Sequence, residues 1–171
     1  MICTLPLLFG LLQANPWQCN HWPKAVEPRE ILAEAQRKDG RDVLDCLFDD
    51  DAAWNRVLSA IDTGKPEWLD VARALLPRAD GGPAEDLRAS LSAALVRSPL
   101  LTLRVIRGEE ASVCGNIEGT RTKNEALAHL RSQREAVLGV SDSDLQSVKE
   151  VCLAAIERSR LEDIPSAGFP K

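Results

Sequence analysis

The side chains best suited to covalent chemistry in this 171-residue chain are five cysteines and two histidines. Cys19, Cys46, Cys114 and Cys152 remain if a leader carrying Cys3 is removed. Four cysteines can pair in three ways in an oxidising compartment. We favour Cys19–Cys46 and Cys114–Cys152, each closing a loop of about thirty to forty residues worth roughly 3–4 kcal/mol. The alternative is that Cys46 and Cys152 are buried free thiols on apolar helix faces.

The two histidines have no obvious catalytic partners. His21 lies between Asn20 and Trp22, His129 lies on a charged helix, and no serine sits in a G-x-S-x-G elbow. Cys19-x-His21 offers two metal ligands, but no second pair at ligand spacing follows. We therefore expect two surface or half-packed imidazoles, with no metal, no cofactor and no enzymatic activity. A hydrolase with two carboxylates assembled in space is an alternative.

One acidic segment is the best candidate contact surface. The stretch RGEEASVCGNIEGTRT, from Arg107 to Thr122, lacks clear periodicity, and long aperiodic loops in compact domains are often functional. A disulfide at Cys114 would tether it and lower the entropy cost of binding. The residues expected to face a basic or hydrogen-bonding partner are Glu109, Glu110, Asn116 and Glu118. The alternative is a solvated connector stapled for stability.

The elements around this segment read as short helices. Trp54, Val57, Leu58 and Ile61 recur at helical spacing, after the acidic run Asp49-Asp50-Asp51, which supplies an N-cap, and before Gly64, which ends the helix. Nearer the N-terminus, we expect two shorter helices at residues 28–38 and 41–48.

Three prolines punctuate the middle of the chain. Pro66, Pro83 and Pro99 stand at expected first helical positions, where a missing N–H costs nothing. Each unit is about twelve helical residues plus a short turn, and two units approach the length of a helical-solenoid repeat. The tetratricopeptide pattern fits this period but fails because the chain has no tyrosine. Residues 100–106 could also form a strand, and we favour a helix.

Two longer helices follow. Thr122 with Glu125, and Ser141 with Asp144, read as capping boxes. The connection from Gly139 to Ser143 is short enough for an antiparallel hairpin. The first expected apolar stripe is Leu127, Leu130, Arg134, Val137 and Leu138, with Arg134 snorkelling at its rim; the second is Leu145, Val148, Cys152, Ala155 and Ile156. The sequence therefore predicts an all-α fold of stacked short antiparallel helical hairpins, solenoid-like or an irregular bundle, stapled by disulfides.

The remaining features concern compartment and partners. The net charge is −5, and no Lys/Arg run exceeds two residues, which argues against nucleic-acid binding. The stretch MICTLPLLFGLLQA carries no charged side chain and resembles a secretory signal cleaved after Ala14. The alternative is an N-terminal core helix of a cytosolic protein. We expect a signal peptide at 1–14, one helical domain at 15–160, an extended tail at 161–171, and no stable membrane insertion after signal removal.

The layout of export signal, paired cysteines, short helical hairpins and acidic balance resembles the small exported helical proteins of Gram-negative bacteria, among them periplasmic immunity proteins. The resemblance implies a periplasmic or secreted, non-enzymatic protein that binds another protein and acts by occlusion, with the Arg107–Thr122 loop plugging a toxin's active-site cleft. The alternative is a structural or adaptor protein of the cell envelope with a helical groove that holds a peptide.

Overall fold

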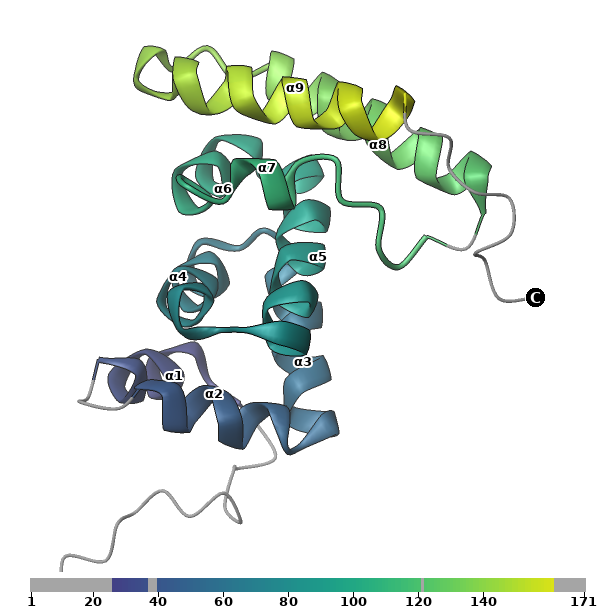
Figure 1. Ribbon diagram of the computed structural model, residues 1–171. Coiled ribbons are helices and arrows are strands. Elements are labelled where there is room, and N and C mark those ends of the chain that lie inside the picture. Colours follow the sequence, from purple (N-terminus) through teal and green to yellow (C-terminus); the bar gives the residue numbers. More distant parts are fainter. Residues whose placement is uncertain (1–25, 37–39, 121, 162–171) are drawn as a thin grey trace, which may run out of the picture.

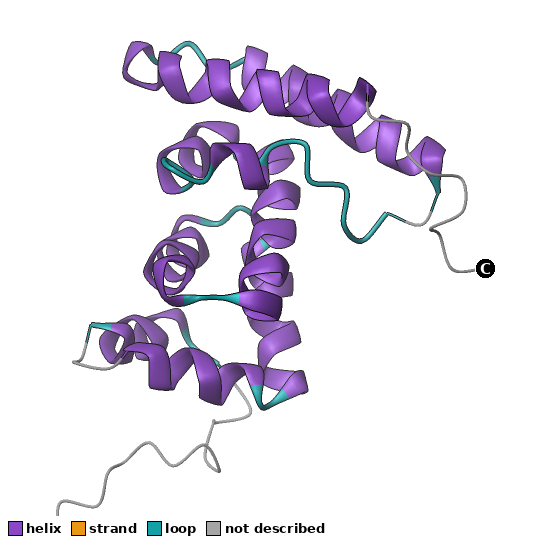
Figure 2. Cartoon of the chain, in the orientation of Figure 1, coloured by secondary structure: helices purple, strands orange, loops and turns teal. Residues whose placement is uncertain are grey.

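The computed structural model describes residues 26–36, 40–120 and 122–161, and every regular element in these ranges is helical (Figures 1 and 2). The all-α prediction is confirmed. The α-helices are α1 (Pro28–Ala35), α2 (Gly40–Phe48), α3 (Asp51–Ile61), α4 (Pro66–Leu75), α5 (Gly81–Arg97), α6 (Pro99–Val105), α7 (Glu110–Val113), α8 (Lys123–Leu138) and α9 (Gln146–Leu161). Two 3₁₀ turns, η2 (Leu76–Arg78) and η3 (Ser143–Leu145), precede α5 and α9. The predicted signal at residues 1–14 lies outside the described residues, as does the predicted tail except for Leu161, which is the last residue of α9 and therefore helical.

The ends of α3 follow from local chemistry. The Asp50 carboxylate accepts hydrogen bonds from the backbone N–H groups of Ala52 and Ala53, both at 3.0 Å, as an N-cap does. Gly64 stands beyond the helix with a φ of 69°, a conformation that glycine adopts without strain. Pro66 then opens α4 at its first position. The predicted start and end of α3 and the predicted start of α4 are therefore confirmed.

The other two prolines differ from each other. Pro99 opens α6, so the helix favoured over a strand for residues 100–106 is confirmed. Pro83, in contrast, is the third residue of α5, which begins at Gly81. The N–H groups of the first helical turn have no carbonyl partner within the helix, so a proline at this position removes no bond. The prediction that Pro83 begins the helix was therefore wrong by two residues.

The contacts between helices form two series. Helix α4 packs against α1 and α6, whereas α5 packs against α3 and α8. Sequential partners α3 and α4, and α5 and α6, also contact each other. Figure 1 shows α1 and α2 at one end and the α8–α9 pair at the other, with α5 spanning the middle. One continuous core results, in which Leu75, Leu91 and Leu103 are fully buried. Whether this packing amounts to a regular solenoid stays a prediction.

The two C-terminal helices α8 and α9 pack against each other, and their predicted details need two corrections. Thr122 caps α8 by accepting from the N–H of Glu125 at 3.2 Å. At the second helix the cap is Asp142, not Ser141, because its carboxylate accepts from the N–H of Asp144 at 2.9 Å as η3 begins.

The buried face of α8 also differs from the predicted stripe. Leu138 is 49% exposed, and Gln133 is fully buried. The second stripe, on η3 and α9, is buried throughout. None of the helices in the described ranges has the length and apolar character needed to cross a membrane.

Candidate functional site

A disulfide anchors the segment that follows α7. Cys114 and Cys152 are joined with their Cα atoms 5.1 Å apart, which ties this segment to α9. Both residues are buried, at 2% and 0% exposure. Cys46 is disulfide-bonded as well, so neither Cys46 nor Cys152 is a free thiol. Cys19, the expected partner of Cys46, lies outside the described residues.

The next residue lies so close to α9 that only glycine fits there. Gly115 has a φ of 83°, and a Cβ on it would stand 2.8 Å from the carbonyl oxygen of Ala155 and 2.6 Å from Oγ of Ser159. The positive φ disfavours any side chain, and the approach to the Ala155 carbonyl leaves no room for one. We call residues 114–120 the wall loop. The disulfide and the Gly115 contact fix the position of the start of this loop against α9.

A buried polar network holds the same loop from α5 and α8. Gln133 Oε1 accepts from the N–H of Gly115 at 3.0 Å, and Gln133 Nε2 donates to Ser92 Oγ at 2.5 Å. The Ser92 hydroxyl donates to the carbonyl of Asn116 at 3.0 Å. His129 Nε2 stands 2.9 Å from Ser92 Oγ and 3.2 Å from Gln133 Nε2. Two consecutive residues of the loop are thus bonded to two different helices.

The Ser92–His129 contact lies in the interior of the molecule. Ser92 is only 2% exposed, and its hydroxyl also lies within hydrogen-bond distance of the Asn116 carbonyl. Burial lowers the pKa of the half-buried His129 and favours the neutral imidazole. The geometry therefore fits the expected half-packed histidine. His21 lies outside the described residues.

The four residues predicted for partner contact have different surroundings. Glu109 accepts from both Nε and Nη2 of Arg88 at 3.1 Å, and Glu110 accepts from the N–H of Gly108 at 2.9 Å. Asn116 Oδ1 accepts from the N–H of Glu118 at 2.8 Å. Of the four, only Glu118 is exposed.

The structure also divides the predicted loop. The one-turn helix α7 lies in its first half and buries Val113, which leaves the wall loop as the aperiodic part. The partner-binding role of the four residues stays a prediction.

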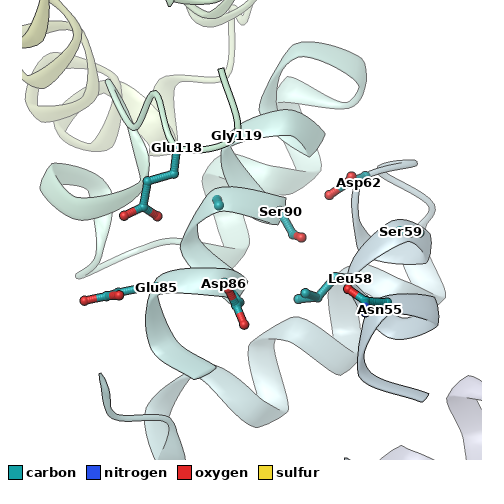
Figure 3. A pocket seen from close by; sticks show the side chains of 10 residues that line it. Asn55, Leu58, Ser59, Asp62, Glu85, Asp86, Ser90, Glu118 and Gly119 are labelled. Atoms are coloured by element: carbon teal, nitrogen blue, oxygen red, sulfur yellow. The ribbon is translucent and has the colours of Figure 1, made fainter. Parts of the chain in front are cut away.

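The wall loop brings Glu118 to an acidic cleft. The cleft has a volume of about 450 Å³ and lies between α3, α5 and the wall loop (Figure 3). Its lining residues are Asn55, Leu58, Ser59, Asp62, Glu85, Asp86, Ala89, Ser90, Glu118 and Gly119. Four of these side chains are carboxylates and none is basic. We call this set the acidic cleft.

Two of the carboxylates have distinct surroundings. Asp86 accepts from Nε1 of Trp54 at 2.8 Å, and the Trp54 ring stands edge-on to Phe48 with centroids 5.8 Å apart. This bond ties α3 to α5 beside the cleft. Burial raises the pKa of Asp62, with the Ser90 hydrogen bond and the charge of Arg97 acting in the opposite direction. One Asp62 oxygen is buried without a hydrogen-bond partner among the described residues.

The cleft is therefore suited to a cationic or hydrogen-donating group. Carboxylates that share one hollow repel each other, and an incoming guanidinium or ammonium group would relieve this repulsion. Within the described ranges, no group of three or more His, Cys, Asp and Glu side chains is arranged to hold a metal ion.

Sequence reasoning did not single out Asp62, Glu85 or Asp86. No local pattern marks them, because α3 and α5 are separated by α4 and meet only in the folded chain. Comparisons with protein-family models, with curated proteins and with solved structures found no match.

Proposed function

We propose that this protein binds another protein outside the cytoplasm, in the manner of an immunity or inhibitor protein, and that the acidic cleft receives a basic segment of that partner. The observation that carries the proposal is the lining of the cleft, with four carboxylates and no basic side chain. The wall loop contributes Glu118, a residue expected from the sequence to contact a partner. The buried disulfide supports an oxidising compartment, where such bonds persist.

A hexa-arginine peptide labelled with fluorescein tests the charge preference of the cleft directly. The variant Glu85→Gln/Glu118→Gln removes two charges from exposed side chains of the cleft. Glu67→Gln/Glu135→Gln is the matched control, because it removes two charges from exposed positions outside the cleft. Fluorescence anisotropy measures Kd, and hexa-glutamate is the negative probe.

We expect the cleft variant to bind hexa-arginine about tenfold more weakly, since each exposed pair contributes up to about 1 kcal/mol. The control variant should bind as the unmodified protein does, and affinity should fall with added salt. The proposal fails if the unmodified protein does not bind the peptide, or if both variants lose affinity equally. Equal losses would indicate attraction to net charge alone.

A second function is favoured by where the cleft lies. Two of its three sides are the helices α3 and α5, so an extended peptide could lie along them as in an adaptor. The single variants distinguish the two functions. Occlusion of a folded partner by the loop requires Glu118→Gln to weaken binding. In an adaptor, Glu85→Gln weakens binding and Glu118→Gln does not.

A further inference from the structure

The wall of the acidic cleft is held by buried residues that do not line it. We propose that Ser92 and Gln133 are positioning residues that set the affinity of the acidic cleft for cationic groups, by holding the wall loop through Gly115 and Asn116. The proposal rests on the proposed function for its binding part, and its structural part stands without it. Ser92 and Gln133 lie outside the cleft lining, so neither touches a ligand there.

The disulfide alone does not fix Glu118. Cys114 is four residues before Glu118, and the backbone between them contains Gly115 with its positive φ. Rotation about these bonds would swing the carboxylate while the disulfide stayed intact. The hydrogen bonds from Gln133 to the Gly115 N–H and from Ser92 to the Asn116 carbonyl restrict this rotation, because they hold the two residues that follow Cys114.

The position of Asn116 is then passed on to Glu118. The Asn116 side chain accepts from the N–H of Glu118 at 2.8 Å, and its Nδ2 donates to the Glu118 carboxylate at 3.4 Å. Thr120 Oγ1 closes the turn by donating to the Ile117 carbonyl at 2.7 Å. A shift of the Asn116 backbone therefore moves the carboxylate that forms one side of the cleft.

Because these residues are buried, water cannot easily replace the hydrogen bonds that hold the wall loop. Gln133 and Ser92 are 0% and 2% exposed, and Gly115 is buried. If Gln133 loses its amide, the Gly115 N–H has no partner where it stands, and a buried N–H without a partner is costly. Movement of the loop toward solvent is the direct way for that group to regain a hydrogen bond.

Three variants test the proposal. Gln133→Met removes the whole amide at similar volume, Gln133→Glu keeps an oxygen acceptor for Gly115, and Ser92→Ala removes only the hydroxyl. Amide hydrogen exchange at residues 116–119 reports loop position, and hexa-arginine anisotropy reports Kd. Val71→Ala is the control for general destabilisation, because Val71 is fully buried in α4, which does not line the cleft.

We expect faster exchange at residues 116–119 and a Kd about tenfold higher in Gln133→Met and Ser92→Ala. Gln133→Glu should show a smaller change in exchange than Gln133→Met. Val71→Ala should unfold more easily and keep the original Kd. This result would show that general destabilisation alone does not weaken binding. Exchange or Kd unchanged in the folded Gln133→Met and Ser92→Ala proteins would overturn the proposal.

Two further results have fixed meanings. If Gln133→Met does not fold, Ser92→Ala decides, because it makes no large cavity. If the unmodified protein binds no peptide, the proposed function fails while hydrogen exchange still decides whether these residues position the loop.

Discussion

At the scale of single residues, His129 occupies an unusual place for an ionisable group. Its imidazole contacts Ser92 and Gln133, two neutral side chains, and burial is what lowers its pKa. Protonation would place a charge in a site whose contacts are neutral, and the cost falls on the folded state only. The stability of the fold is thereby linked to pH.

The sign of this linkage can be tested. The pKa of His129 in the folded chain lies below its ordinary value of 6.5, so the unfolded chain binds more protons between these two values. The free energy of unfolding should therefore be fully retained above pH ~6.5 and decline as pH falls below it, by at most about 1.4 kcal/mol per pH unit for one proton. Urea unfolding between pH 8 and about 5.5 measures the slope.

The variant His129→Gln is the control, because it cannot titrate. Subtracting its slope removes the contribution of every other group, including Asp62, whose raised pKa acts in the opposite sense. The same slope in both proteins would show that His129 does not contribute.

Gln133 illustrates what sequence reasoning overlooks at this scale. The apolar stripe of α8 predicted that Arg134 would stand at the rim, and the fully buried residue is its neighbour Gln133. A polar side chain is buried without loss when all its hydrogen bonds are made, and here the partners come from Ser92 and Gly115. Those partners are far away in the sequence, so no local pattern announces them.

At the scale of elements, helix ends were predictable where one residue determines them. Asp50, Pro66, Pro99 and Thr122 each act on their own turn, through a cap or a fixed φ. The predictions for Pro83 and Ser141 were wrong because the residue type alone did not fix one position. Asp142 is a capping residue as good as Ser141, and a helix tolerates proline anywhere in its first turn.

The Cys114–Cys152 disulfide is a covalent cross-link between two described elements, because it joins the end of α7 to α9. The Cys114→Ala/Cys152→Ala variant should lose about 4 kcal/mol of unfolding free energy in the chain-entropy model for a separation of 38 residues. Urea unfolding under oxidising conditions measures the loss. The Cys114→Ala single variant, with its remaining thiol blocked, is the companion measurement.

The double variant also tests the role of the loop. Because the wall loop would lose its anchor on α9, amide exchange at residues 116–119 should increase as well. Unchanged stability in the double variant would contradict a stabilising role for this bond.

At the scale of the whole molecule, an intact-mass measurement tests the cellular compartment of the protein. If the chain is exported as we propose, protein recovered from its native host should lack residues 1–14. Its four remaining cysteines should resist alkylation until they are reduced.

Mass spectrometry with and without reductant, each followed by alkylation, gives both results at once. A full-length mass with five alkylatable thiols would instead indicate a cytosolic protein and would contradict the immunity hypothesis. The matched reference is recombinant full-length chain, denatured and reduced, which fixes the mass of the fully alkylated state.

The sequence by itself determined the helical class, several helix ends and the segment that contains the wall loop, and it favoured the Cys114–Cys152 pair among three possible pairings. These features depend on residues close together in the chain, or on the few cysteines available for pairing. Only the tertiary structure decided that Asp62, Glu85 and Asp86 share a cleft with Glu118, and that Ser92 and Gln133 hold its wall. The physical reason is that hydrogen bonds and charge repulsion act through space, and the packing of α5 against α3 and α8 sets which groups meet.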